Sequence, residues 1–226
     1  MSCSEPGCRG WHRPRPQRSP AGERGSTRPS HIFSSSIKHF RLSSGQWTLV
    51  ALAIFVTAGA TLLMMGRVPI CTCGYVKPWH GIVASSENSQ HLSDWYTFSH
   101  VIHGFAFYGL FWLVAPRSPL AFRLAAATLL EASWEIVENT DLVINRYREA
   151  TVSLDYYGDS VINSMADILS MVAGFVVASR LRLWVVVALT AALETFVAWM
   201  IRDNLTLNII MLLYPLDAIR EWQAGR

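Results

Sequence analysis

The amino-acid sequence predicts an all-α fold, a polytopic transmembrane helix bundle with five or six spans and its amino terminus inside. The first observation is composition: 51% of the 226 residues are hydrophobic and only 15% are charged, against about 25% in soluble domains. The second is a set of nearly charge-free stretches of about twenty residues, the length that crosses a bilayer as a helix. The composition fits neither a wholly disordered chain, nor a disulfide scaffold, nor a nucleic-acid-binding module.

The first 45 residues differ from the remainder of the chain. They hold eight basic and two acidic side chains, together with ten Ser, five Pro and five Gly. Such a segment buries too little apolar surface to offset its chain entropy. It is therefore predicted to be a disordered basic cytoplasmic tail over 1–45. An organelle-transit segment and a misassigned start codon are the alternatives.

The helix-bundle domain is predicted over residues 46–223. The expected spans are about 47–66, 96–115, 120–139, 160–179 and 183–201. The apolar stretch 205–219 is either a short sixth span or a re-entrant piece. The positive-inside rule places the basic tail, Arg117, Arg123, Arg180 and Arg182 in the cytoplasm. Loops 67–95 and 140–159 then lie outside.

Polar residues within the predicted spans recur at helical spacing. Glu131, Glu135 and Glu138 form one stripe, and Asp159, Asn163 and Asp167 form another. Tyr96, His100, His103 and Phe107 form a third stripe. A carboxylate facing lipid at the bilayer centre costs about 2.5–3.5 kcal/mol, so these stripes are expected to face protein or water.

The stripes are expected to meet in one cavity. At about 1.5 Å per residue, His103, Glu131, Asp167 and Glu194 lie at matching depths below the outer boundary. We therefore expect a polar cavity that opens outward, with the cytoplasmic half of the bundle packed without polar groups. Small residues at Gly104, Gly109 and Gly174 favour close helix contact around it.

Three chemistries fit this residue set. Imidazole and carboxylate groups bind divalent metals, relay protons, or serve only as a hydrogen-bonded polar core. In the metal interpretation the ligands are His100, His103, Glu131 and Asp167, and the cofactor is a divalent metal. His100, His103 and Glu135 are the candidate catalytic residues. No HExxH motif, nucleotide-binding loop or nucleophile elbow is present.

A second group of polar residues is predicted to bind substrate at the mouth of the cavity. Its members are Glu87, Asn88, His91, Asp94, Tyr96, Asp159, Asn163 and Arg202. Arg202 is the expected anion contact, and Asp159 or Ser160 is the expected cap of the following helix. A solvated loop is the alternative for residues 85–94.

The four cysteines lie in two pairs. Cys3 and Cys8 belong to the tail, and Cys71 and Cys73 to the first outer loop. A C-x-C pair is expected not to close on itself without strain. A metal site that combines these cysteines with His80 is the alternative.

Five stretches carry a family resemblance: CGYVKPWHG (73–81), SSENSQHLSDWYTFSHVIHGF (85–105), EASWEIVENT (131–140), ATVSLDYYGDSVINSMAD (150–167) and MIRDNLTLNIIML (200–212). Over about 46–223 the chain resembles uncharacterised protein family 0314, also called domain of unknown function 2585. The resemblance implies a multi-pass protein of the bacterial inner membrane and brings no catalytic residues. A looser similarity to VanZ-like membrane proteins favours an envelope role.

The functional hypothesis is a site that binds or acts on an envelope component such as a lipid or glycolipid head group. A proton-coupled transporter and a non-catalytic assembly factor are the alternatives. The expected partners are the bilayer and a lipid-linked substrate, with no nucleic acid. Whether the protein is an enzyme is left open by the sequence, as is its oligomeric state.

Overall fold

The computed structural model describes residues 42–151 and 155–225. The chain divides into two units, Met1–Phe40 and Arg41–Arg226. The first unit lies outside the described residues, as does nearly all of the predicted tail. Everything below concerns the second unit.

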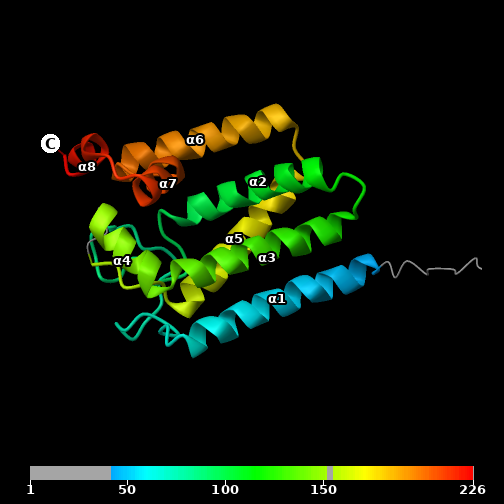
Figure 1. Ribbon diagram of the computed structural model, residues 1–226, viewed down its shortest axis with the longest axis horizontal. Helices are drawn as coiled ribbons and strands as arrows, with labels where there is room; N and C mark the ends of the chain where they lie inside the picture. Colours follow the sequence, from blue (N-terminus) through cyan, green and yellow to red (C-terminus); the bar gives the residue numbers. More distant parts are fainter. Residues whose placement is uncertain (1–41, 152–154, 226) are drawn as a thin grey trace, which may run out of the picture. The chain divides into compact units, whose positions relative to one another are not determined.

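The described residues form eight helices and no strand, which confirms the all-helical class (Figure 1). The helices are α1 (Ser44–Met64), α2 (Thr97–Val114), α3 (Leu120–Glu138), α4 (Asp141–Ala150), α5 (Val161–Ala178), α6 (Leu183–Ile201), α7 (Leu205–Leu213) and α8 (Asp217–Gln223). Four of them, α1, α2, α5 and α6, are long and apolar enough to cross a membrane. The number of spans and the inside position of the amino terminus stay predictions.

Local sequence signals fix where several helices begin. Ser43 and Gln46 form a capping box, in which each side chain bonds the backbone of the other. The Ser160 hydroxyl caps α5 by accepting from the amide of Asn163, as predicted. Asn204 caps α7 in the same way. These side chains satisfy amide groups that a helix start leaves without partners.

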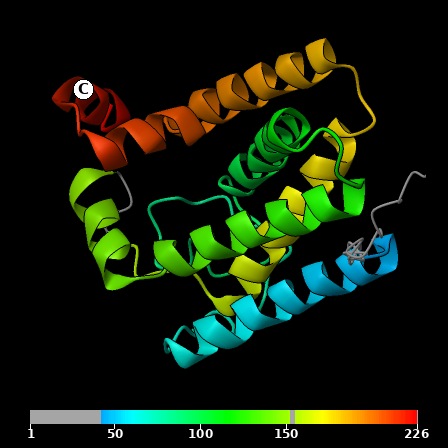
Figure 2. The ribbon, with the colours of Figure 1, turned by 45° about the vertical axis from the view of Figure 1, so that its right-hand side comes forward.

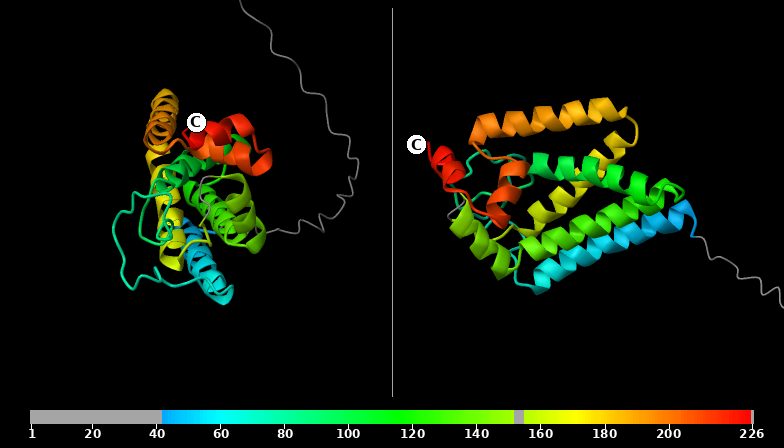
Figure 3. Two further views of the ribbon diagram at one scale, coloured as in Figure 1. Left: turned by 90° about the vertical axis from the view of Figure 1, so that its left-hand side faces the viewer. Right: turned by 45° about the horizontal axis from the view of Figure 1, so that its top comes forward.

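The five long helices alternate in direction between two ends (Figures 1 and 3). The start of α1 and the connections 115–119 and 179–182 lie at one end, here called the turn end. Residues 65–96, α4, α7 and α8 gather at the other, here called the loop end. Two segments distant in sequence, α4 and α7, are in contact there.

Helix α5 passes through the middle of the bundle and packs on α1, α2 and α3, while α1 lies along α3 (Figure 2). One apolar cluster joins Ala58, Ala132 and Ile168 between α1, α3 and α5. A second cluster is centred on Met171 and Phe175 and fills the half near the turn end. This half is packed with apolar side chains, so the polar groups are concentrated toward the loop end.

The stretch 205–219 does not form one continuous helix. Helix α7 has nine residues and α8 has seven, separated by a segment that contains Pro215. Each is much shorter than the roughly 20 residues needed for a span. Both lie at the loop end, beside α4. Helix α4 itself falls in the predicted outer loop 140–159, where no helix was expected.

Two glycines set the close approach of α2 and α5. A Cβ on Gly104 would lie 2.1 Å from the carbonyl oxygen of Met171, and one on Gly174 would lie 2.2 Å from that of Val101. Both obstacles are backbone atoms, so a side chain could not be accommodated by a rotamer change. Gly109 differs, because a Cβ there meets nothing within 4 Å.

Gly104→Ala is therefore expected to destabilise the bundle by about 3 kcal/mol by forcing α2 away from α5. Gly109→Ala, one and a half turns further along the same helix, is the matched control and is expected to be neutral or slightly stabilising. Thermal unfolding in detergent measures both. Equal midpoints for the two variants would contradict the assigned contact.

Candidate functional site

A histidine–carboxylate cluster lies between α2, α3 and α5. His100 and His103 come from α2, one turn apart, and both contact Glu131 of α3. The Nδ1 atom of His100 is 2.6 Å from Glu131 Oε1. The Nδ1 atom of His103 is 3.1 Å from each oxygen of the same carboxylate. The predicted stripes therefore do face one another.

His100 is the centre of the cluster. Its Nδ1 lies 3.4 Å from Glu135 Oε1, and its Nε2 lies 3.8 Å from Asp167 Oδ2. The Thr97 hydroxyl donates to the other oxygen of Asp167 at 3.2 Å. One imidazole thus faces three acids from two helices. Buried charges are tolerated only when they are paired in this way.

Glu135 is the least satisfied member of the cluster. Its side chain is fully buried, and within the described part of the chain neither carboxylate oxygen has a hydrogen-bond partner. Among the described residues, its one ion-pair contact is the 3.4 Å approach of Oε1 to His100 Nδ1. A buried carboxylate without hydrogen bonds is rare in native proteins and calls for an explanation such as a bound ion.

A cavity of about 360 Å³ opens beside the cluster. His100, His103, Asn163 and Asp167 line it together with Glu138 and Asp159. Its remaining walls come from Asn88, Ser89, Tyr96, Ser99, Phe107, Trp134, Tyr147, Tyr156, Leu205, Asn208, Ile209 and Leu212. None of these described lining residues is a lysine or an arginine, so the cavity combines acidic and histidine groups with aromatic and aliphatic walls.

The Asp159 carboxylate, in the cavity lining, accepts hydrogen bonds from two neighbouring side chains. The Tyr156 hydroxyl donates to Oδ1 at 2.9 Å, and the Asn139 amide donates to Oδ2 at 3.0 Å. Burial raises the pKa of Asp159 to about 6. Tyr147, from the unpredicted helix α4, donates to Asn208 of α7 at 3.0 Å. That bond joins two walls of the cavity.

Residues 85–94 are anchored to the start of α5. The Asn163 amide donates to the carbonyl of His91 at 2.9 Å, and the Gln90 amide donates to that of Gly158 at 2.8 Å. Asp94 accepts from the amides of Ser89 and Tyr96. Burial raises the pKa of the Asp94 carboxyl. Of the predicted substrate-binding residues in this loop, Asn88 lines the cavity. His91 and Asp94 do not line it, but they accept hydrogen bonds from residues that do.

Glu87 lies outside the cavity lining. It pairs with Lys77 at 2.5 Å and with His91 at 2.9 Å, and it accepts from Tyr75. These hydrogen bonds, from Lys77 first, lower the pKa of Glu87 to about 2. The predicted substrate contact is thus already engaged by the loop itself.

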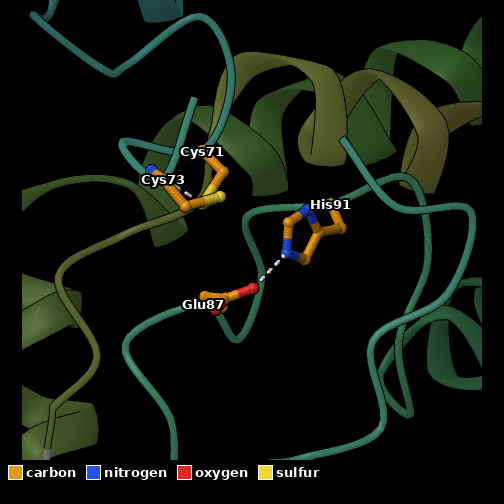
Figure 4. Close-up of side chains that lie close together, drawn as sticks. All are labelled: Cys71, Cys73, Glu87 and His91. Atoms are coloured by element: carbon orange, nitrogen blue, oxygen red, sulfur yellow. Dashed lines mark hydrogen bonds and ion pairs between the residues drawn. A yellow bond between two sulfur atoms is a disulfide. The ribbon is translucent and has the colours of Figure 1, made fainter. Parts of the chain in front are cut away.

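The outer cysteines are paired with each other, although closure without strain was not expected for a C-x-C pair. Cys71 and Cys73 form a disulfide (Figure 4). The intervening Thr72 is exposed, and Gly74 follows with a positive φ of 84°. His80 is not one of the residues grouped with this pair: its Nε2 contacts the Ile82 carbonyl, and its Nδ1 lies 3.9 Å from Glu87.

Two further predicted residues lie apart from the cluster. Arg202 is exposed and donates to the carbonyl of Trp222, so it contacts α8 rather than the cavity. Glu194 accepts from the amides of Leu205 and Thr206 at 3.1 Å each and so supports the start of α7. Arg202 thus contacts α8 and Glu194 contacts α7, the two short helices at the loop end.

The comparisons with known proteins give a family. Residues 62–225 match the family described as "Protein of unknown function (DUF2585)". The chain belongs to this family. It is 56% identical over 194 residues to a UPF0314 protein of Paracoccus denitrificans, covering 86% of this chain and all of that one. It is 58% identical over 179 residues to a UPF0314 protein of Sinorhizobium fredii, covering 79% and 91%. No solved structure matches.

The family resemblance expected from the sequence motifs is confirmed by these matches, which reach every element of the candidate site. The looser VanZ-like similarity stays a prediction. The family description states no activity, so the site must be argued from its geometry. Sequence reasoning missed Trp134, Tyr147 and Asn208 as lining residues. The amphipathic spacing of Ile144 and Tyr147 was the available signal for helix α4.

Asp203 offers a pH test of the loop end. Burial raises its pKa to about 6 from the usual 3.8, while Tyr96 donates to one oxygen and Gln223 to the other. Folding therefore favours the protonated Asp203 carboxyl. Its contribution to the free energy of unfolding is complete below pH 3.8 and is lost as pH rises through about 6. Relative to Asp203→Asn, the wild-type free energy of unfolding should fall by about 3 kcal/mol between pH 4 and 7. Parallel pH profiles for the two proteins would refute this.

Proposed function

We propose that this chain is an inner-membrane protein that binds the polar head group of an envelope lipid or glycolipid in the loop-end cavity, next to a divalent cation held by the histidine–carboxylate cluster. The observation that carries the proposal is the lining of the cavity. His100, His103 and Asp167 supply polar groups on one side. Leu205, Ile209 and Leu212 of α7 supply an apolar wall on the other.

An amphiphile matches this division. A sugar or other hydroxylated head group can bond the polar side and stack on Trp134 or Tyr156, while the first methylene groups of a chain contact α7. Ligand sites are commonly apolar clefts with a few convergent polar groups. A volume of about 360 Å³ holds a head group rather than a whole lipid, so the acyl chains would remain in the bilayer.

The donor set fits a divalent cation. His100, His103 and Glu131 bring one ligand atom each to within 4.8 Å of one another, and so do His100, Glu135 and Glu138. Two imidazole nitrogens and a carboxylate with an open position resemble catalytic zinc sites. The buried, unpartnered oxygens of Glu135 lie beside these donors and would gain a counter-charge. Asp167 reaches the same histidine from the opposite side.

A bound cation would also allow this acidic cavity to bind a phosphorylated head group. Glu138, Asp159 and Asp167 would repel an anion by themselves. A bound divalent ion can polarise a carbonyl or phosphoryl oxygen or activate water. Should the site catalyse a reaction with the cation held by His100, Glu135 and Glu138, His103 would not be a ligand. It lines the cavity and is partly exposed, so it would be placed to accept a proton.

The loop end is proposed to face the outside of the cell. Four arginines, Arg117, Arg123, Arg180 and Arg182, lie in or beside the short connections at the turn end, where α1 begins at the end of the basic segment 1–45. The positive-inside rule assigns such a face to the cytoplasm. The basic residues of the described loop end are instead bonded to carbonyl or carboxylate oxygens within it. The Cys71–Cys73 disulfide at the loop end supports the same orientation, because disulfides persist in oxidising compartments. With α3 as a fifth span, the acids of that helix are shielded from lipid by α2 and α5.

The packing favours a binding site over a transport pathway. A proton-coupled transporter needs polar access from both ends. Met171, Phe175 and Ala127 are fully or almost fully buried in the half near the turn end, with Phe107 and Leu124 packed on them. On α2 the cavity lining therefore ends at Phe107, one turn past His103.

Metal content tests the cluster directly. Glu131→Gln keeps the shape of the side chain but removes the charge between both histidines, so the purified protein is expected to lose about one equivalent of bound divalent metal. Glu194→Gln, a partly buried acid on α6, is the matched control and should keep it. Elemental analysis after purification in mild detergent gives the result. Equal metal content in both variants, or none in the wild type, would exclude the metal.

Co-purified lipid tests the head-group proposal separately. Leu212→Trp fills the apolar wall and is expected to lower the amount of retained lipid about tenfold, for a loss of about 1.4 kcal/mol. Metal content should not change. Leu213→Trp, whose side chain is 79% exposed, is the control. Native mass spectrometry reads both. Unchanged lipid retention in Leu212→Trp would count against the cavity as the lipid site.

A further inference from the structure

A second group of reactive side chains lies in the loop 65–96, outside the residues that line the cavity. It consists of the Cys71–Cys73 disulfide, Glu87 and His91, drawn in Figure 4. One atom from each of the four residues lies within 4.8 Å of the others. Neither the head-group site nor the cation site uses any of them.

The two cysteines differ in exposure. Cys71 is 3% exposed, whereas Cys73 is exposed. The backbone amide of Cys73 donates to Cys71 Sγ at 3.1 Å. An external thiolate can therefore reach Cys73, and the amide is placed to stabilise negative charge that develops on Cys71. Attack on the accessible sulfur and departure of a stabilised thiolate are the requirements of thiol–disulfide exchange.

The hydrogen bonds of His91 favour this chemistry over a metal site. Its Nδ1 accepts from the Lys77 amide at 3.2 Å, so the neutral ring carries its proton on Nε2, which donates to Glu87 at 2.9 Å. Both ring nitrogens are occupied, which leaves no lone pair for a cation. The Tyr75 ring stacks on the imidazole at 5.8 Å. Lys77, Glu87 and His91 thus form a fixed support beside the sulfurs.

We propose that Cys71 and Cys73 form a redox-active pair that exchanges electrons with an external dithiol. A thiolate of the dithiol attacks Cys73 Sγ, the Cys71–Cys73 bond breaks, and Cys71 leaves as a thiolate that takes a proton from water. The second thiolate of the dithiol then attacks the dithiol sulfur that is bonded to Cys73. This closes the disulfide of the reductant and releases Cys73 as a thiolate. Two electrons pass to the chain, and the dithiol becomes a disulfide.

The chain around the pair leaves room for the reduced form. Thr72, between the cysteines, is exposed, and a Cβ on Gly74 would meet nothing within 4 Å. The exposed side of the pair, at residues 72–74, therefore borders open space. This inference does not depend on what the cavity binds.

The test uses the full chain carrying Cys3→Ser and Cys8→Ser, so that only the loop pair can react. The folded protein in detergent is treated with reduced glutathione, quenched with acid and mapped by tandem mass spectrometry. Glutathione is expected on Cys73 in about tenfold or greater excess over Cys71. In denaturant, where both sulfurs are accessible, the preference should fall close to one.

Dithiothreitol supplies the second measurement, because it completes both steps. The folded protein is expected to gain two alkylatable thiols and to recover its disulfide with oxidised glutathione. A pair that stays oxidised in excess dithiothreitol while folded would overturn the proposal, as would equal labelling of both cysteines. Retention of a second zinc equivalent by the reduced protein, absent from the oxidised protein and lost in His91→Ala, would replace it with a metal site.

Discussion

The constraint on which this structure depends is the burial of carboxylates inside an apolar bundle. Glu131 and Glu135 are 0% exposed on a helix that packs between α1, α2 and α5. Uncompensated charges there would cost several kcal/mol each. His100 and His103 compensate Glu131 directly, which fixes the rotation of α2 against α3. The close Gly104–Gly174 approach then brings α5 near enough for Asp167 to reach the same histidine.

The loop end follows from that arrangement. The polar stripes of α2, α3 and α5 all lie toward the loop end. The segments that connect these helices at that end therefore pack against polar side chains. Residues 88–91 do so by bonding the start of α5, and α4 and α7 meet through Tyr147 and Asn208. The cover encloses a cavity that is polar on one side and apolar on the other. The disulfide segment lies on the outer part of the same cover.

The sequence predicts the long helices and the facing stripes because both depend on local periodicity of about 3.6 residues. Helix α4 was not predicted, although Ile144 and Tyr147 recur at helical spacing, because its polar composition, with Asp141, Arg146 and Arg148, gives no apolar span. The contacts of Glu87, His91 and Arg202 were also not predicted. Their partners, Lys77, Asn163 and Trp222, are set by how loops fold back, which spacing alone does not encode. Distances within the cluster likewise required three packed helices.

The central claim is that the histidine–carboxylate cluster is a ligand site for a divalent cation and not only a polar core. X-ray absorption spectroscopy of the full chain loaded with one equivalent of zinc tests it most directly. The account predicts imidazole nitrogen and carboxylate oxygen neighbours at about 2.0–2.2 Å, lost in Glu131→Gln. Sulfur neighbours, or a spectrum of zinc surrounded by water alone, would contradict it.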